Sequence, residues 1–224
     1  MKQDPPKKPS TLPRPRLGRP RADQAGEVER RIRDAATAIF LDLGFRRATL
    51  DQVAERAHVG KTTLYSRYST KEALFEAVVR ESVETFLQDM NAEDVGGTLE
   101  ETLVHVGEAV AQATLTPHSI SIMRITLAET NHLPEVAREG FRLGFGACVQ
   151  SIADGILRAG HPLDSDRALQ MGTRFVQLAL HPLYFHAFFG DDLHTLNERA
   201  VQDIRQVARM LANDFSKGVQ GDRG

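Results

Sequence analysis

The chain has 224 residues, 41% of them hydrophobic, and a formal net charge of −2. This length and apolar content allow a substantial core in one or two domains. Cys148 is the only cysteine, which excludes an intrachain disulfide and a zinc site built from several cysteines. No apolar run reaches the roughly 18 residues of a membrane span, and the N-terminus lacks the apolar core of a signal peptide. We therefore expect a cytoplasmic protein with no membrane partner.

Charge is distributed unevenly along the chain. Residues 1–90 carry 17 Lys and Arg against 13 Asp and Glu, whereas residues 91–224 carry 11 against 17. A basic N-terminal part joined to an acidic C-terminal part predicts contact with nucleic acid at one end only.

Residues 1–26 are expected to form a disordered basic arm, because six of the ten prolines lie in the first 20 residues and cations greatly outnumber acids there. Within this arm, a Gly-Arg-Pro sequence resembles the core of an AT-hook, whose extended backbone lays guanidinium groups along a narrow A·T-rich minor groove. This resemblance predicts minor-groove contacts by Arg16, Arg19 and Arg21. The alternative is a solvated basic tail that adds only diffuse attraction.

The next segment, 27–75, predicts a three-helix domain. Apolar residues at i, i+3, i+4 and i+7 indicate a core-facing first helix that ends at Gly44. The members of this apolar stripe are Ile32, Ala35, Ala36, Ile39, Phe40 and Leu43.

Residues 49–75 predict two short helices joined by a tight turn, followed by the start of a third. Thr49 with Gln52 forms a T-x-x-Q capping box, the segment 57–60 breaks the helix, and 61–68 form the second helix. Ser69 with Glu72 forms another capping box, which should open the helix that follows. This arrangement is typical of a helix-turn-helix DNA reader, whose second helix enters the major groove.

The outward side of the second helix carries cationic and hydroxyl groups, which suit phosphates and base edges. These residues are Lys61, Thr62, Thr63, Ser66 and Arg67, with Tyr65 at the boundary. The plainer alternative is a three-helix core with a solvated polar face. A phosphate-binding loop at Gly60-Lys61-Thr62 is excluded by spacing, because that loop needs a glycine where Glu55 stands.

Residues 28–75 resemble the DNA-binding domain of the TetR family of bacterial transcriptional repressors. The resemblance lies in the first-helix stripe, the Leu43-Gly44-Phe45 bend, and the segments 64–68 and 71–74. It implies phosphate contacts by Thr49, Lys61, Thr63, Tyr65 and Lys71, and base contacts by Lys61, Thr62, Ser66 and Arg67. Two positions depart from the family pattern: His58 replaces a common turn glycine, and Gly60 replaces a common serine cap.

The remainder, 76–217, is expected to be helical, followed by a disordered tail at 218–224. Gly, Pro and capping residues predict helices over 98–114, 117–131, 134–160, 164–190 and 195–217. The sequence therefore predicts an all-α fold. The resemblance implies a TetR-like protein of about nine helices, with an N-terminal helix-turn-helix domain and a C-terminal ligand-binding and dimerisation domain.

The segment 175–189 is apolar on nearly all sides, so it must be covered on two sides, and Pro182 should kink it. One side can pack on its own subunit and the other on a second copy, which predicts a four-helix-bundle homodimer. The expected interface residues are Leu183, Phe188, Phe189, Ile204, Val207 and Leu211. A central helix of a monomer is the alternative.

The resemblance also implies a small-molecule pocket between the DNA reader and the dimer helices. Its ligand is expected to be hydrophobic or amphipathic, and binding should move the helix at 71–89. The candidate lining residues are His105, Met123, Phe141, Phe145, Cys148, Met171, Phe175 and His181, although each could be plain core. Gly140, Gly144 and Gly146 leave room for a ligand or for close helix contact.

No motif supports an enzyme. The chain has no G-x-S-x-G or H-E-x-x-H sequence, and His181 and His186 are off the i, i+4 spacing of a helical metal site. We expect neither a cofactor nor a metal. The expected function is a DNA-binding regulator, a repressor by resemblance, that binds a palindromic operator as a dimer and is released by a ligand. The alternatives are an activator and a helical ligand-binding module without DNA function.

Overall fold

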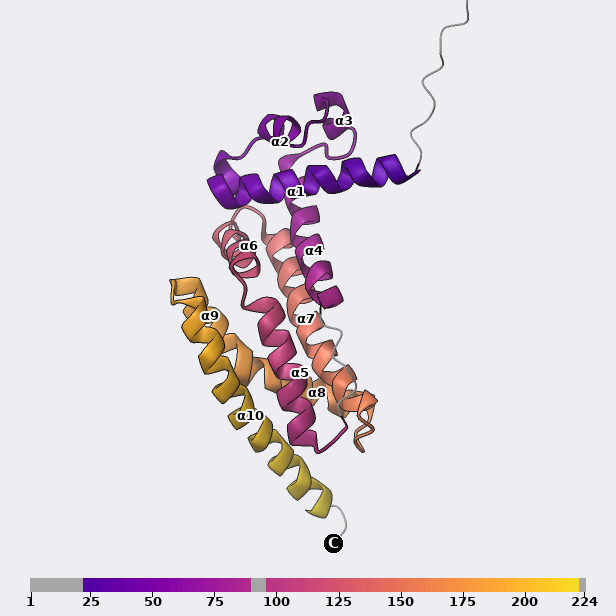
Figure 1. Ribbon diagram of the computed structural model, residues 1–224, viewed down its shortest axis with the longest axis vertical. Coiled ribbons are helices and arrows are strands. Elements are labelled where there is room, and N and C mark those ends of the chain that lie inside the picture. Colours follow the sequence, from indigo (N-terminus) through magenta and orange to yellow (C-terminus); the bar gives the residue numbers. More distant parts are fainter. Residues whose placement is uncertain (1–21, 90–95, 222–224) are drawn as a thin grey trace, which may run out of the picture.

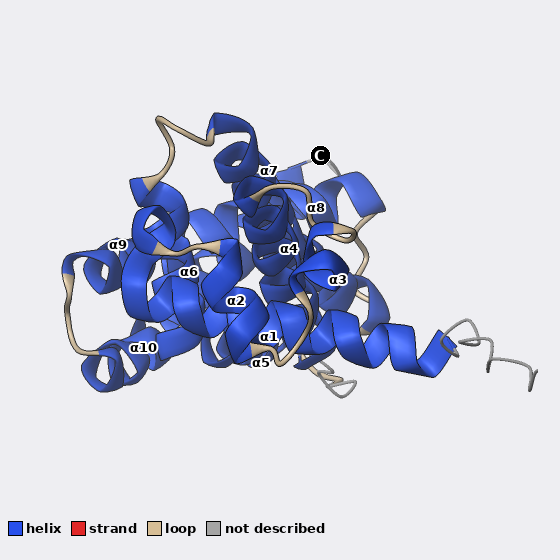
Figure 2. Cartoon of the chain, turned by 90° about the horizontal axis from the view of Figure 1, so that it is seen from above, coloured by secondary structure: helices blue, strands red, loops and turns tan. Residues whose placement is uncertain are grey.

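The computed structural model describes residues 22–89 and 96–221, and among these every regular element is helical (Figures 1 and 2). The elements are α1 (Ala22–Arg47), α2 (Leu50–Arg56), α3 (Lys61–Tyr65), α4 (Lys71–Asp89), α5 (Leu99–Thr114), α6 (Pro117–Ala128), α7 (Pro134–Arg158), α8 (Ser165–Phe175), the π-helical segment η1 (Val176–Leu180), α9 (His181–Phe189) and α10 (Leu193–Gly221). The prediction of an all-α fold is confirmed. If the contiguous α8, η1 and α9 are counted together, the described residues form the nine expected helices.

Helices α1 to α3 sit at one end of the elongated molecule, and α5 and α7 to α10 form its longer body (Figure 1). The small end has its own core, in which the rings of Phe40 and Phe75 meet edge to face at 5.2 Å and Phe45 packs against both. The expected bend at Gly44 is present, with φ 75° and ψ 161° inside α1. Only glycine adopts such angles readily, so this residue turns the chain toward α2.

Helix α1 begins at Ala22, five positions before the expected boundary, so residues 22–26 are helical rather than part of an arm. The last helix likewise extends to Gly221 and includes most of the expected tail. Composition alone misplaced both ends, because a helix can extend into polar residues once its apolar part is anchored on a core.

Helix α4 joins the two parts of the molecule. Its first half places Leu74, Phe75, Val78 and Val79 in the small core, and its second half packs on α7. The expected domain boundary at 75/76 therefore falls inside a continuous helix. Its cap is Thr70, whose hydroxyl accepts from the Ala73 backbone at 3.1 Å, so the predicted Ser69–Glu72 capping box does not form.

The body packs closely because glycines let its helices approach one another. A Cβ added at Gly107 of α5 would lie 2.4 Å from the Phe175 ring, and one at Gly172 of α8 would lie 2.7 Å from the Val149 carbonyl. Phe175 is fully buried in this core. These contacts fix α5, α7 and α8 as one packed block.

Pro182 does not interrupt the run of helix from α8 to α9. The five π-helical residues 176–180 precede it, and Pro182 occupies the first turn of α9, where a missing backbone N–H costs little. Gly190, at φ 102°, ends α9. Asp192, not the predicted Thr195, begins α10: its carboxylate accepts from the Thr195 backbone N–H at 2.9 Å, and this bond lowers the pKa of Asp192.

Among the described residues, no helix combines the length and the apolar character needed to cross a membrane.

Candidate nucleic-acid interface and ligand cavity

The turn between α2 and α3 is built as expected. The Thr49 hydroxyl accepts from the Gln52 backbone while the Gln52 side chain accepts from the Thr49 backbone at 2.8 Å, which completes the predicted capping box. His58 adopts φ 53° in the turn, and Gly60 begins α3 without a side-chain cap. Arg31 of α1 fixes the corner from below, because its guanidinium donates to the carbonyls of Ala57 and His58.

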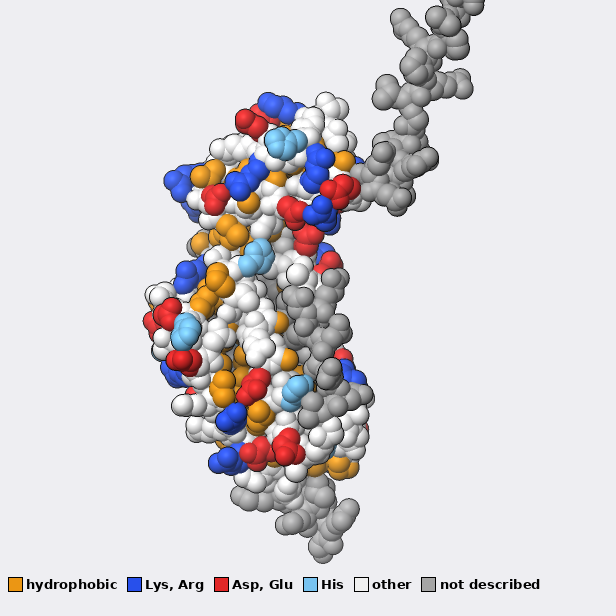
Figure 3. Space-filling view, viewed as in Figure 1, with side chains coloured by type: hydrophobic (Ala, Val, Ile, Leu, Met, Phe, Trp, Pro, Cys, Tyr) orange, Lys and Arg blue, Asp and Glu red, His pale blue; other side chains and the backbone are white. Residues whose placement is uncertain are grey.

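Helix α3 is shorter than predicted, since it ends at Tyr65 and residues 66–67 form a turn. Leu64 is fully buried, which anchors the helix and leaves its other side in solvent. The exposed residues of this surface are Thr49, Lys61, Thr62, Thr63, Tyr65 and Ser66. We call these six residues the α3 surface. The small end shows Lys and Arg side chains interspersed with acids (Figure 3).

Lys61 is the cation on the α3 surface, and its side chain is 66% exposed. Its ammonium group lies 2.7 Å from the Asp51 carboxylate, and this hydrogen bond raises the pKa of Lys61. Because both groups are exposed, the pair is worth little and can exchange for a phosphate contact.

Two predicted DNA contacts have partners inside the protein. Lys71 donates to the carbonyls of Phe45, Arg46 and Ala48 at 2.7 to 3.2 Å and lies 4.4 Å from the centre of the Phe45 ring. It holds the bend of α1 together, so its ammonium group is engaged within the protein rather than offered to a phosphate as predicted. Arg67 is partly buried and pairs with Glu29 at 3.4 Å, so its charge is engaged within the protein and is not free to read a base edge as predicted.

Glu29 of α1 is the centre of a charged network at the end of α3. It accepts the Tyr68 hydroxyl and pairs with Arg67 and with Arg33. Arg33 in turn pairs with Glu81 of α4 at 2.9 Å. Burial, followed by the hydrogen bond to Glu29, raises the pKa of Tyr68 to about 12, so the phenol stays protonated. The network therefore ties the end of α3 to the middle of α4.

Arg16, Arg19 and Arg21, predicted to enter the minor groove, lie outside the described residues.

A cavity of about 280 Å³ lies where α4, α5, α6, α7 and the η1–α9 segment meet. The predicted Met123, Phe141, Phe145, Cys148 and His181 line it. The sequence missed the contributions of α4 and α5 and most of those of α6 and α9. These missed residues include Val79, Ser82, Val83, Thr114, Ser119, Ile122, Thr126, Tyr184, Phe185 and Phe188.

Three predicted pocket residues do not line the cavity. Phe175 fills the notch at Gly107 inside the core, Met171 packs against the same core, and His105 is half-buried on α5. Each lies on a helix that lines the cavity or on the helix directly before one, but its side chain is not part of the lining. Of the three glycines expected to leave room for a ligand or for close helix contact, Gly140 and Gly144 line the cavity, whereas Gly146 is exposed.

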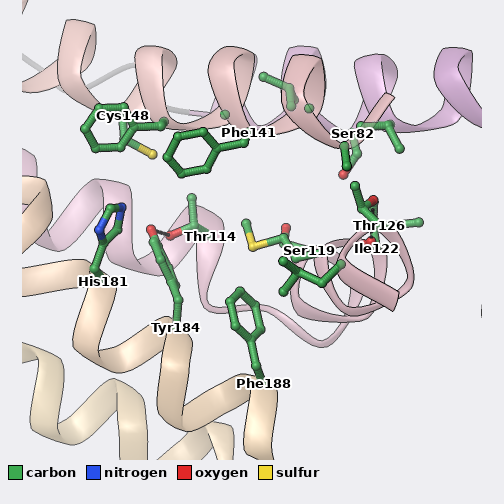
Figure 4. Close-up of a pocket in the computed structure, with 18 of the residues that line it drawn as sticks. Ser82, Thr114, Ser119, Ile122, Thr126, Phe141, Cys148, His181, Tyr184 and Phe188 are labelled. Carbon is green, nitrogen blue, oxygen red and sulfur yellow. Dashed lines mark hydrogen bonds between the residues drawn. The ribbon is translucent and has the colours of Figure 1, made fainter. Parts of the chain in front are cut away.

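Polar groups at one end of the cavity come from Thr114, Tyr184, Cys148 and His181 (Figure 4). Thr114 donates to the Val110 carbonyl at 2.7 Å, so the Tyr184 hydroxyl, 2.7 Å away, donates to Thr114. Burial raises the pKa of Cys148 to about 12 and that of Tyr184 well above its ordinary value. Burial also lowers the pKa of His181. All these groups are therefore neutral near pH 7.

The predicted dimer residues are mostly covered within the chain itself. Leu183, Ile204, Val207 and Leu211 are buried, and Phe188 lines the cavity. Only Phe189 remains free, at 86% exposed. The exposed apolar stripe of this region consists instead of Leu178, Phe185 and Phe189, with Pro182 between them.

Two family models match the chain. Residues 32–78 match the model for bacterial regulatory proteins of the tetR family, and residues 101–212 match the C-terminal domain of AefR-like transcriptional repressors.

Individual relatives agree with these family matches. The chain is 26% identical to the uncharacterized HTH-type transcriptional regulator YdeS of Bacillus subtilis, over 91% of this chain and 93% of YdeS. It is 36% identical to the HTH-type transcriptional activator FasR of Mycolicibacterium smegmatis, over 33% of this chain and 35% of FasR. Several curated relatives match over only 24% to 52% of their own length.

Solved structures share the architecture. A TetR-family regulator from Mesorhizobium loti aligns with a TM-score of 0.69 at 17% identity, over 84% of this chain and 98% of that one. At this identity the likeness concerns the fold alone.

Proposed function

Because this chain belongs to the TetR family of bacterial regulatory proteins, we propose that it is a repressor that binds a palindromic operator as a homodimer and leaves it when a small molecule enters the cavity. Its relatives are transcriptional regulators rather than enzymes. The observation that carries the proposal is the α3 surface, a solvent-facing set of hydroxyl groups around an exposed lysine, held rigid by buried Leu64. Acting on DNA, the protein would work in the cytoplasm.

On the α3 surface, Lys61 and Thr49 suit phosphates, and Thr62, Thr63 and Ser66 suit phosphates or base edges. Tyr65, at 47% exposed, can lay its ring and hydroxyl against the sugar-phosphate backbone. This division predicts that Lys61 contributes affinity for any duplex, whereas the hydroxyl groups contribute sequence preference.

The proposed dimer uses the exposed stripe of Leu178, Phe185 and Phe189 rather than the buried residues first expected. Contiguous apolar exposure of this kind is typical of an interface. A two-fold pairing would present two copies of α3 to successive major grooves. A Phe189→Glu variant should be monomeric by sedimentation and should bind a palindromic operator much more weakly than a dimer does. A native protein that sediments as a monomer at micromolar concentration would remove this part of the proposal.

The proposed ligand response acts through α4 and α6, which line the cavity and reach the small end. Ser82 and Val83 line the cavity directly beside Glu81, which pairs with Arg33 in the network that reaches the end of α3. Helix α6 ends at the buried Glu129, which pairs with Arg46 at 3.2 Å. A ligand that displaces either helix would therefore reorient α3.

The test is a mobility-shift measurement with DNA from upstream of the protein's own gene, followed by selection from random DNA. Specific binding by the native chain, lost on combined replacement of Lys61 and Thr62 by Ala, is the expected result. No preference for any sequence would leave a ligand-binding module as the function. FasR is an activator, so a reporter fused to the selected operator decides between repression and activation.

A further inference from the structure

None of the described residues that line the cavity carries a charged side chain, whereas the face drawn in Figure 3 carries charged side chains of both signs. We propose that the cavity binds a neutral, flat aromatic molecule that carries a hydroxyl or carbonyl group. This inference rests on the proposed ligand-responsive function and specifies the chemical class of the ligand.

The absence of charge in the described lining selects against ions. An ionised carboxylate or ammonium group moved from water into an apolar cavity loses its hydration, and here it would find no opposite charge in return. A neutral hydroxyl or carbonyl loses far less and is compensated by one hydrogen bond. The cavity should therefore discriminate between the neutral and charged members of a matched pair of compounds.

The walls favour a planar molecule. Phe141 and Phe145 stack on α7 with nearly parallel rings, 7° apart in plane and 5.5 Å between centres. The α7 wall also includes Gly140 and Gly144, and a Cβ added at Gly144 would meet only Val83, at 3.9 Å. Opposite this wall, Tyr184 and Phe188 project from α9 (Figure 4). Aromatic side chains on two facing walls, with open space beside Gly144, match a fused or linked ring system.

The hydrogen bonds already made in the cavity indicate where the polar group of the ligand would bind. The Tyr184 hydrogen is committed to Thr114, because the Thr114 hydrogen is already donated to Val110. The His181 ring, by contrast, makes no hydrogen bond among the described residues, and it lies 5.3 Å from the Phe145 ring and 6.3 Å from the Tyr184 ring, centre to centre. A neutral imidazole offers one donor and one acceptor. It can therefore bind a ligand hydroxyl or carbonyl at this end.

The probes that test the class are 2-naphthol, which is neutral near pH 7, and 2-naphthoate, which has the same rings but is ionised. The chain has no tryptophan, so naphthalene fluorescence can be followed in the full-length protein without an indole background, and calorimetry provides an independent measurement. We expect 2-naphthol to bind at least about 100-fold more tightly than 2-naphthoate. Equal or tighter binding of the anion, or no detectable binding of 2-naphthol, would overturn the inference.

A matched pair of variants locates the bound probe. Gly144→Leu should fill the cavity and abolish 2-naphthol binding, whereas Gly146→Leu, two positions along the same helix on an exposed surface, should leave it unchanged. Circular dichroism and thermal unfolding verify that both variants fold. If both bind like the native chain, the ring system is not in this cavity and the inference fails.

His181→Leu tests the polar end. Without the imidazole, the preference for 2-naphthol over naphthalene should fall about tenfold, while naphthalene itself binds at least as well as before. An unchanged preference would refute the role of His181 as the hydrogen-bonding partner.

These measurements use the free protein, so they are separate from the test of regulation. Selective binding of 2-naphthol by a chain that shows no operator preference would support the ligand class and refute the regulator. A protein that binds a specific operator, leaves it when a charged compound is added and does not bind 2-naphthol would support the regulator and refute the ligand class.

Discussion

The α3 surface and the cavity are assembled from the chain in opposite ways. The α2–turn–α3 unit with its caps spans only residues 49–66, so its caps, turn and outward side chains all belong to one short segment. The cavity takes its walls from residues as far apart as Val79 and Phe188. The first site is polar and open to solvent, whereas the second is apolar and walled by packed helices. A site encoded locally can therefore be recognised residue by residue, whereas a site made by packing cannot.

The first prediction compares the stability cost of removing a ring from the core with that of removing a ring beside the cavity. Phe175 was expected to line the pocket but is fully buried against Gly107. Phe175→Ala should therefore reduce the free energy of unfolding by about 3–5 kcal/mol, the usual cost of removing a buried phenylalanine ring. Denaturant unfolding measures this loss. Phe141→Ala, at a position 63% exposed beside the cavity, is the control. If both substitutions cost the same small amount, the assignment of Phe175 to the core is wrong.

The second prediction separates structure from DNA contact within the small end. Lys71 donates three hydrogen bonds to carbonyls around the Gly44 bend. Lys71→Met should cost about 2 kcal/mol in unfolding free energy, because hydrogen bonds from charged groups are worth about 1.5–3 kcal/mol. It should leave the salt dependence of operator binding unchanged. A reduced salt slope with unaltered stability would return Lys71 to the DNA interface.

Lys61→Ala should show the opposite behaviour. Operator affinity should fall about tenfold, and the slope of log K against log salt should decrease by about one, because one phosphate contact is lost. Stability should hardly change, since the Lys61–Asp51 pair is exposed. Titrations over a range of salt concentrations give both values, with Arg30→Ala on the exposed side of α1 as a control cation.

The fourth prediction concerns the coupling between the cavity and the α3 surface. Glu81→Gln breaks the ion pair with Arg33 beside the cavity residues Ser82 and Val83. Operator affinity and ligand affinity measured separately should remain within about twofold, while the ligand-induced loss of operator affinity shrinks several-fold. Glu84→Gln, exposed on the same helix, is the matched control. Full release by the Glu81 variant would show that coupling takes another route.

The last prediction is a small pH dependence of stability that arises from His181 in the cavity. Burial lowers the pKa of His181 below its ordinary value of 6.5. The folded state therefore resists protonation more than the unfolded state, and its stabilising contribution is present above about pH 6.5 and lost as the pH falls through the lower folded pKa. The melting temperature should drop less between about pH 7 and 5 in His181→Leu than in the native chain. His194→Leu, at a highly exposed position, should behave like the native chain.

Local residue patterns predicted the helical class, the Thr49 capping box, the Gly44 bend and the outward-facing side chains of α3. Each of these depends on residues within a few positions of one another, where spacing fixes which groups can meet. The family resemblance placed Met123, Phe145 and His181 near a pocket without showing which helices would enclose it.

Which partner each side chain meets, when the partners are remote in sequence, depends on how the helices pack. Apolar periodicity shows that Phe175, Ile204 and Leu211 face a core, but not whether that core lies within one chain or between two. Lys71 and Arg67 likewise carry charges suited to DNA, and only the packing of α1 against them supplies the carbonyls and the carboxylate that occupy them. Side-chain chemistry is a property of the residue, whereas the choice among competing partners depends on the complete arrangement of the helices.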